Sequence, residues 1–435
     1  MKTDEPQRKN MTAFETQIAS NSILKEINNG CQTNLVLSPL LLHIALNMLA
    51  SASTGRTLKQ LLQFLESESI TDLNAQSSIF AELATSGGGE GPIISLANGI
   101  WVHNSFPLKP SYKQLVEDVY KAKSQSFDFV NQGEQVRHEI NSWAREASKG
   151  HIYPLLPRGF FTEDAIALLA SAIYFKGTWV QKFDASDTKD GDFHLRNGQT
   201  IKVPFMRMSY TRQLYGSFES FKLLKMAYKN GESHNKKYAM YIFLPHEKDG
   251  LQELVEKFRS DPRFLLENQK VSKVLLKELQ LPKMKYEYEL NVKKTMEEVG
   301  LDLPFDEKKA EITEMVETHE VVYLSKVIQK SYIEVDEEGT IATAVNISLL
   351  SAGASPCSMP PPPQHSFVAD HPFLFMIKEE VSGIIVFVGA ALNPISEGVT
   401  GKKRKKEATK KKMKEQKHRK KKQLVPWPER ITITT

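Results

Sequence analysis

The sequence predicts an α+β fold built around a large β-sheet, because helical and strand-like segments occupy different parts of the chain. Near the N-terminus, apolar residues recur at the three- and four-residue spacing of helices. Later segments are short, apolar and rich in β-branched and aromatic residues, which favours strands. With 435 residues, of which 40% are hydrophobic and 25% charged, the chain has the composition of a globular protein.

Two helices are expected in the first part of the chain. Ser38-Pro39 marks the start of one, and its apolar residues surround nearly the whole helix, so it should be buried. A second helix is expected near Val136–Ser148. It should end at Lys149-Gly150, because glycine readily adopts the left-handed conformation that terminates many helices.

Strands are expected mainly after the second helix. The segments with strand character are Ala165–Phe175, Ile201–Met206, Tyr238–Leu244, Tyr332–Val335, Phe373–Ile377 and Ile384–Val388. The glycine-rich segment Ser86–Pro92 is interpreted as a surface loop. It is not a phosphate-binding loop, because it lacks the GxGxxG spacing and no Lys-Ser/Thr pair follows it.

The charge is divided unevenly along the chain. The last 35 residues contain 15 Lys or Arg and three Glu, a net charge of +12, whereas the whole chain carries +5. The first 400 residues therefore carry −7. The sequence describes an acidic body with a basic tail, so the overall charge does not indicate what the body binds.

Several classes of protein are excluded by what the chain lacks. Cys31 and Cys357 are its two cysteines, too few for a disulfide framework or a cysteine-based zinc site. The apolar stretch Ala165–Phe175 is shorter than the roughly 20 residues of a membrane helix, so we expect no membrane association. The charged N-terminus does not resemble a secretory signal, which favours a cytoplasmic location.

We expect no catalytic residue, metal or cofactor. The sequence lacks GxSxG, HExxH, a P-loop and a dinucleotide-binding fingerprint. His138-Glu139 and His246-Glu247 have no second histidine four residues on, so a structural role is favoured for both. Cys357 stands beside a proline run with no acid or base nearby, which favours a plain exposed thiol over a nucleophile.

The segment Glu334–Leu350 has the pattern of a strand but the surroundings of a loop. Gly339 interrupts it, and the uncharged Ser/Pro-rich stretch that extends to Ser366 follows it. It is either an edge strand that runs into a linker or a loop able to pack into a sheet, since its alternate residues are small. Those residues are Thr340, Ala342, Ala344, Asn346 and Ser348, with Leu350 at the end.

From about Met11 to Pro394 the sequence resembles the serpin family, and within it the plant (Z-type) serpins. The matching motifs occur in the family's order along the chain. They begin with NLVLSPL at Asn34, LANGIW at Leu96, INSW at Ile140 and AIYFKGTW at Ala172. They continue with VPFM at Val203, EEGT at Glu337, FVADHPF at Phe367 and the closing Asn393-Pro394.

The resemblance implies a serpin domain over residues 1–394, with a large central sheet, further sheets, surrounding helices and an exposed reactive-centre loop at about 337–366. Residues 395–435 would be a basic, disordered C-terminal extension. It further implies irreversible protease inhibition, in which a protease cuts the loop, forms an acyl-enzyme and is trapped when the loop inserts into the sheet. The alternative is a non-inhibitory serpin, with a binding or structural role, whose loop is cleaved without trapping.

The resemblance also assigns roles to individual residues. Glu337, Glu338, Gly339, Thr340, Ala342 and Ala344 would form the hinge where insertion begins. Glu337 would pair with Lys283 at the top of the sheet, beside Trp179. The family's interval places the scissile bond at Gly353-Ala354, and because the loop is about three residues longer than in typical plant relatives, Leu350-Ser351 is the competing site.

The chain departs from the family beneath the sheet and in the loop. Where the family's sheet-opening cluster usually has Ser, Asn and His, this chain has Leu41, Ser171 and Gln329, although Ser38 is retained. We therefore expect an altered hydrogen-bond network there. In the loop, Ile341 replaces a usual Glu, and Thr343 and Val345 interrupt a run of alanines, which keeps the non-inhibitory alternative open.

The loop and the tail predict partners. No Lys, Arg or Asp lies between Ile341 and Ser366, so trypsin-like and aspartate-specific proteases are excluded. Chymotrypsin-like serine proteases and papain-like cysteine proteases remain. Lys402–Lys406 (KKRKK) resembles a nuclear localisation signal, so the nuclear import machinery is a further expected partner. The cytoplasm or nucleus is the expected location, and unconventional secretion is left open.

Overall fold

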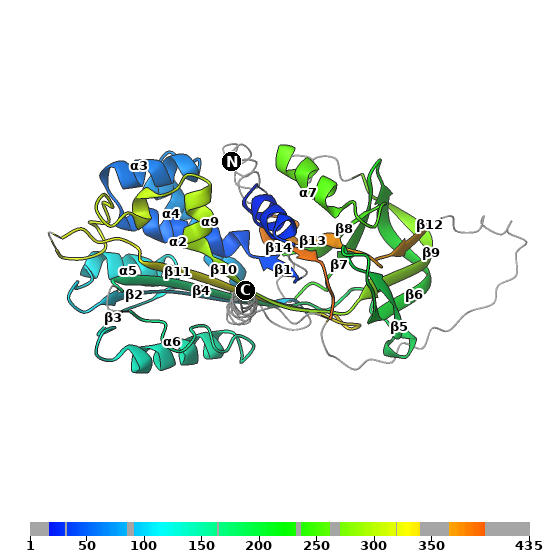
Figure 1. Ribbon diagram of the computed structural model, residues 1–435, viewed down its shortest axis with the longest axis horizontal. Helices are drawn as coiled ribbons and strands as arrows, with labels where there is room; N and C mark the ends of the chain where they lie inside the picture. The colour runs from blue at the N-terminus through cyan, green and yellow to red at the C-terminus, as the bar shows by residue number, and fades with distance from the viewer. Residues whose placement is uncertain are drawn as a thin grey trace, which may run out of the picture. The chain divides into compact units, whose positions relative to one another are not determined.

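The computed structural model describes residues 17–30, 33–84, 91–162, 165–231, 236–261, 270–318, 320–339 and 365–395. The predicted loop at Ser86–Pro92 lies largely outside them, as do most of the expected reactive-centre loop and the whole basic tail. Figure 1 shows the described residues as an α+β fold, as the sequence predicts, with helices packed against two β-sheets.

The described helices gather mainly in the first third of the chain. Residues 17–28 are helical, and α2 begins where predicted, with Ser38 as N-cap accepting a hydrogen bond from Leu41 N and with Pro39 in the first turn. All residues of α2 are buried, as its apolar pattern indicates. The helices are α2 (Pro39–Ala52), α3 (Gly55–Phe64), α4 (Ile70–Ala84), α5 (Pro110–Asp118), α6 (Gly133–Ala147), α7 (Leu251–Ser260) and α9 (Val292–Glu298). Short 3₁₀ turns lie at Ala185–Asp187 and Leu303–Phe305.

One sheet has five strands in the order β10-β11-β4-β2-β3. Its strands are β2 (Ile93–His103), β3 (Lys123–Phe127), β4 (Ala167–Lys176), β10 (Met284–Asn291) and β11 (Lys326–Val335). In Figure 1, α6 covers one face of this sheet, and α2 and α4 lie on the other. Because both faces are covered, β4 is buried along almost its whole length and consists of a nearly continuous apolar run.

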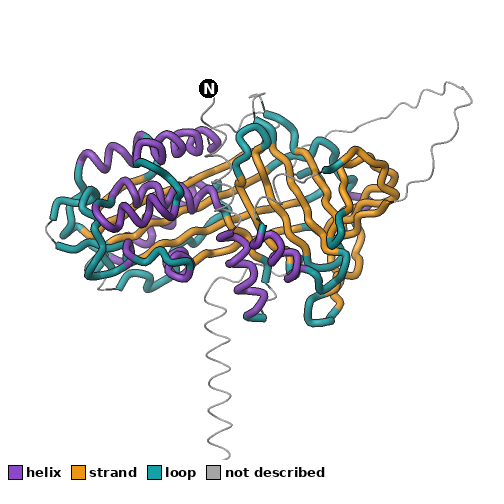
Figure 2. The backbone as a smooth tube through the Cα atoms, turned by 90° about the horizontal axis from the view of Figure 1, so that it is seen from above, coloured by secondary structure: helices purple, strands orange, loops and turns teal. Residues whose placement is uncertain are grey.

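The other sheet has nine strands, in the order β1-β14-β13-β8-β7-β6-β9-β12, with β5 paired to β6. Figure 2 shows its strands toward one end of the fold, with most helices toward the other. The strands are β1 (Leu35–Leu37), β5 (Lys189–His194), β6 (Thr200–Ser217), β7 (Phe221–Ala227), β8 (Tyr238–Pro245), β9 (Ser272–Pro282), β12 (His365–Val368), β13 (Phe373–Glu379) and β14 (Ile385–Ala391). All six segments that were predicted to be strands form strands in one or other of the two sheets, although β6 and β11 are much longer than predicted.

Candidate functional site: the seam between β4 and β11 and the hinge above it

The centre of the five-stranded sheet is a parallel pair of strands, β4 and β11, which we call the seam. Its register runs from Lys326 opposite Leu168 to Ile333 opposite Phe175. On their outer sides β4 pairs antiparallel with β2 and β11 antiparallel with β10. The seam is thus flanked by antiparallel pairs, and the two strands come from segments about 160 residues apart in the sequence.

The hinge lies directly beyond the end of β11 and is fastened by Glu337. Lys283 Nζ lies 2.8 Å from Glu337 Oε1, and the Thr188 hydroxyl donates to the same oxygen over 2.6 Å. The backbone N–H of Phe183 donates to the Glu337 carbonyl over 2.8 Å. The structure therefore brings together the Glu337 and Lys283 that the resemblance pairs, and adds Thr188, which sequence reasoning missed.

Trp179 fixes the residues on both sides of Glu337. Its indole Nε1 donates to the carbonyl of Asp336 over 3.0 Å, and its backbone N–H donates to the carbonyl of Glu338 over 3.0 Å. The fully buried ring stacks on Tyr228 with the centroids 4.3 Å apart. The chain that leaves β11 is therefore held against the segment that follows β4, at the end of the seam where both strands terminate.

The charges at the hinge shift two pKa values in opposite directions. Burial alone would raise the pKa of Glu337, but the hydrogen bonds from Lys283 and Thr188 outweigh it and hold that pKa below its ordinary value. Burial raises the pKa of Asp336, and the negative charges of Glu337 and Glu334 act in the same direction. Glu337 therefore stays ionised, and keeps its bond to Lys283, at pH values where an ordinary glutamate becomes protonated.

The residues to which the resemblance assigns sheet opening lie midway along the seam, between the sheet and the start of α2. Gln329 in β11 and Ser171 in β4 are register partners, and both are buried. Gln329 Nε2 donates to the backbone carbonyl of Ser38 over 2.5 Å. The hydroxyl of Ser171 has no hydrogen-bond partner among the described residues, while Leu41 is packed in the apolar core. Gln329 therefore provides a polar link between the seam and α2.

Sequence reasoning missed the polar contacts on the opposite face of the seam, which is the face covered by α6. Lys330 is 1% exposed, and its Nζ donates to the carbonyl of Pro154 over 2.7 Å and lies 2.5 Å from Glu287 Oε1. The signal in the sequence is a lysine that alternates with Ile328 and Tyr332 on one face of a central strand, because buried lysines require partners. On the same face, His151 stacks on Tyr174.

The remaining predicted site residues fall outside the described part of the chain. They are Thr340, Ala342 and Ala344 of the hinge, and the candidate scissile pairs Leu350-Ser351 and Gly353-Ala354. At the far end of the loop, β12 begins at His365, one residue before the predicted end of the loop at Ser366. The two described ends of the loop lie in different sheets, since β11 belongs to the five-stranded sheet and β12 to the nine-stranded one.

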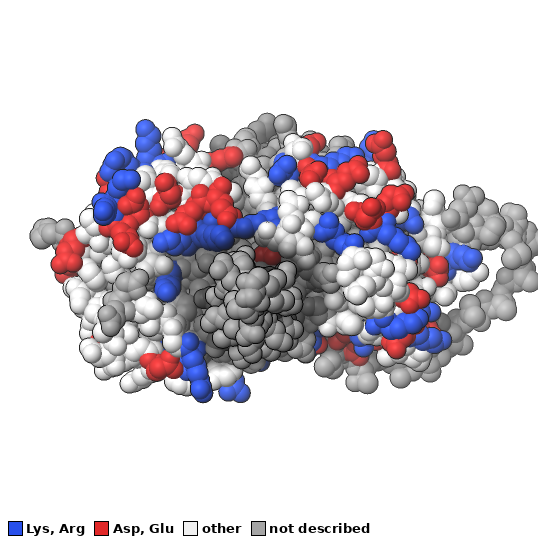
Figure 3. Space-filling model, viewed as in Figure 1, with Lys and Arg blue, Asp and Glu red and all other residues white. Residues whose placement is uncertain are grey.

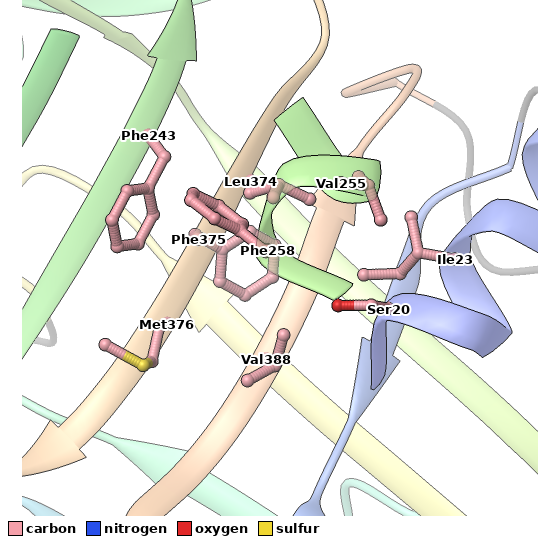
Figure 4. Close-up of a pocket in the computed structure, with 9 residues that line it drawn as sticks. All are labelled: Ser20, Ile23, Phe243, Val255, Phe258, Leu374, Phe375, Met376 and Val388. Atoms are coloured by element: carbon pink, nitrogen blue, oxygen red, sulfur yellow. The ribbon is translucent and has the colours of Figure 1, made fainter. Parts of the chain in front are cut away.

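The cavity shown in Figure 4 is too small to hold a cofactor-sized molecule. A cavity of about 20 Å³ lies between helical residues 17–28, α7 and strands β8, β13 and β14 (Figure 4). Apart from Ser20, the labelled lining residues are apolar, and the space fits about one water molecule. Within the described ranges, no group of three or more His, Cys, Asp or Glu residues is placed to hold a metal. None of the described helices is long and apolar enough to span a membrane.

Charges of both signs are intermixed on the face seen in Figure 3. Ion pairs among the described residues include Lys25 with Glu298 and Lys109 with Glu314. The described residues visible on this face therefore form no patch of a single charge sign.

The covered five-stranded sheet, its central parallel seam and the hinge above it define a serpin-type architecture. The family profile described as "Serpin (serine protease inhibitor)" matches residues 15–394. The chain is 37% identical over 394 residues to Serpin-Z3 of Arabidopsis thaliana, covering 88% of this chain and 97% of that protein. It is 36% identical over 371 residues to Serpin-ZXA of Oryza sativa subsp. japonica, covering 84% and 91%.

A solved structure agrees with these sequence matches. An Arabidopsis serpin in its native stressed conformation superimposes with a TM-score of 0.80 at 34% identity, covering 90% of this chain and 99% of that one. The chain therefore belongs to the serpin family of protease inhibitors, and its relatives are plant serpins of the Z type. The resemblance seen in the sequence is confirmed.

Proposed function

We propose that this serpin traps a protease irreversibly as a suicide substrate. The observation that carries the proposal is the parallel seam with a fastened hinge at its end. The described chain after β11 ends in a turn in which the N–H of Gly339 donates to the carbonyl of Asp336. A loop that folded back after this turn and entered the seam would run antiparallel to both β4 and β11. One parallel pair would become two antiparallel pairs, which are slightly more stable per residue, and each inserted residue would add ladder hydrogen bonds.

The chemistry would be supplied by the protease. Its serine or cysteine attacks the carbonyl carbon before the scissile bond, and an ester or thioester forms as the amine of the next residue leaves with a proton. Insertion of the cut loop would then carry the attached protease along the sheet. The trap is complete if this distorts the oxyanion hole of the protease, because water then no longer hydrolyses the acyl bond.

A non-inhibitory serpin is the second candidate, and a specific feature of the seam favours it. The buried hydroxyl of Ser171 has no hydrogen-bond partner among the described residues, and Gln329 contacts α2 through a backbone carbonyl. In the loop, Asn346 would point into the sheet after insertion, at a cost of about 1–3 kcal/mol if it lacked a partner. Slow insertion would let the protease hydrolyse the acyl bond first and leave.

The test is to mix the full chain with chymotrypsin, papain and trypsin and to look for covalent complexes on a denaturing gel. We expect complexes with chymotrypsin or papain and a released peptide that begins at Ser351 or Ala354. Leu350 favours the first site, because burying its side chain in a specificity pocket is worth roughly 1.5–3 kcal/mol. Trypsin should form no complex, because no Lys or Arg lies within 341–366.

Two matched variants identify the scissile bond. Leu350→Arg or Gly353→Arg should create a trypsin complex, but only the variant at the residue that enters the pocket should do so. Cleavage inside 341–366 without any complex would support the non-inhibitory alternative. A stable complex of the unaltered chain with trypsin, or cleavage only outside this window, would contradict the proposed specificity.

For the basic tail we propose a role in nuclear import. Of the 21 residues at 402–422, 14 are Lys or Arg, and Lys402–Lys406 has the composition of an import signal. Deleting the residues after Gly401 should move a fluorescent fusion from the nucleus to the cytoplasm and remove any salt-sensitive retention on nucleic acid. Replacing Lys402–Lys406 alone with Gln separates import from general charge. An unchanged distribution in both variants would show that the tail is a solvated extension without this role.

A further inference from the structure

His151, in the segment that follows α6, contacts both strands of the seam. Its ring stacks on Tyr174 of β4, with the centroids 4.1 Å apart and the planes 6° from parallel, and lies 5.1 Å from Tyr332 of β11. Tyr174 and Tyr332 are register partners whose rings are 5.8 Å apart. One side chain from outside the sheet therefore bridges the two strands that loop insertion would separate.

The three-ring contact is incompatible with an inserted strand. Neighbouring strands lie about 4.8 Å apart, so a strand placed between β4 and β11 would increase their separation to roughly 9.6 Å. Aromatic pairs interact at centroid distances of about 4.5–7 Å. At that separation His151 cannot keep its present distances of 4.1 Å to Tyr174 and 5.1 Å to Tyr332, so the stack has to rearrange before insertion is complete.

The backbone around His151 is fastened to β11 and to α6. Lys330 donates to the carbonyl of Pro154, three residues further along. Asn141 of α6 donates to the carbonyl of Leu156 over 2.9 Å and accepts from its N–H over 2.7 Å. Ile152, the residue after His151, is fully buried. Separation of the strands therefore acts directly on the stack.

We propose that His151 is a latch that holds the seam closed and sets the rate at which it opens for loop insertion. This inference rests on the proposed function and adds a regulating residue to it. The groups that face the latch come from three strands: Tyr174 and Lys176 of β4, Tyr332 and Glu334 of β11, and Lys285 of β10. Tyr332 also donates its hydroxyl proton to Glu334 Oε2 over 2.9 Å.

The latch is expected to loosen in acid. Burial lowers the pKa of His151, and the positive charges of Lys176 and Lys285 act in the same direction against the negative charge of Glu334. A histidine whose pKa is lowered in the closed state binds fewer protons there than when released. The closed state is therefore favoured above the ordinary pKa of about 6.5 and loses that advantage as the pH falls through the lowered value.

The experiment measures how fast the full chain takes up a labelled synthetic peptide with the sequence of residues 340–351, followed by fluorescence anisotropy. His151→Ala should accelerate uptake about 2- to 13-fold at pH 7.5, the range that corresponds to loss of an aromatic pair. His151→Phe keeps a stacking ring and should retain the original rate. His138→Ala removes an exposed histidine from α6 and is the matched control, with an unchanged rate.

The pH dependence provides a second readout that a merely structural residue would not affect. Uptake by the unaltered chain should accelerate between pH 7.5 and 5.5, and this acceleration should disappear in His151→Phe. Two results would overturn the latch but not the proposed function. One is an equal uptake rate for the unaltered chain and His151→Ala, and the other is a pH profile of His151→Phe that equals that of the unaltered chain. Failure of all the proteins to take up the peptide would overturn loop insertion, and with it the proposed function.

Discussion

Cleavage within 341–366 should raise the midpoint of thermal unfolding by about 10 °C or more. A strand of about ten residues placed between β4 and β11 forms ladder hydrogen bonds on both sides, each worth about 0.5–1.5 kcal/mol net. For a domain of this size, a gain of about 10 kcal/mol corresponds to a shift of roughly 12 °C. The expected result follows from the arrangement of the seam, since a strand inserted between β4 and β11 would leave their outer pairings with β2 and β10 intact.

The measurement is thermal unfolding followed by circular dichroism, before and after limited cleavage by chymotrypsin. Sequencing of the new N-terminus verifies that the cut lies inside the loop, and protein incubated with inactivated protease is the control. An unchanged midpoint after complete cleavage would mean that this chain does not insert its loop. The non-inhibitory alternative would then stand.

Gly339→Ala should lower the free energy of unfolding by about 2–5 kcal/mol. Gly339 has φ +75°, a conformation that costs residues with a side chain about 1–2 kcal/mol. A Cβ atom there would lie 2.4 Å from Gly177 O and 2.4 Å from Trp179 N, which are backbone atoms. Relief of this clash requires the hinge to move away and to break the hydrogen bond from Trp179 N to Glu338 O.

Gly198→Ala is the matched control, because the chain offers a second glycine with the same backbone conformation and open surroundings. Gly198 has φ +80°, and a Cβ there would meet no atom within 4 Å. Gly198→Ala should lower the free energy of unfolding only by the cost of a positive φ for a residue with a side chain, about 1–2 kcal/mol. Urea unfolding of both variants provides the comparison. Equal destabilisation would show that close packing of the hinge against residues 177–179 contributes nothing.

The helices and strands that could be predicted are those in which an apolar sequence coincides with burial of the whole element. The helix at Pro39–Ala52 and the strand at Ala167–Lys176 are almost continuously apolar, and each is buried along nearly its whole length. Strands β9 and β10 were not predicted from the residue pattern. Charged residues occur along both, and β10 lies at the edge of the five-stranded sheet, where one side of the strand remains unpaired.

The candidate site depended more on resemblance than on local pattern. Glu337 and Lys283 are 54 residues apart in the sequence, and no periodicity connects them. The resemblance paired them, and the structure places their charged groups 2.8 Å apart. It assigned no role to Thr188, His151 or Lys330, because these contacts depend on which side chains this chain places against the hinge and beneath α6.

The sequence alone determined the family, the acidic body with its basic tail, and a loop without Lys or Arg between Ile341 and Ser366. These are properties of composition and motif order, which do not depend on how the chain packs. Only the tertiary structure decided that β4 and β11 lie side by side in parallel register and that the hinge glycine packs against the backbone of residues 177–179. It also decided that His151 bridges Tyr174 and Tyr332. Each of these contacts joins segments distant in the sequence, and their geometry is set by the common packing of sheet, helix and hinge around buried side chains.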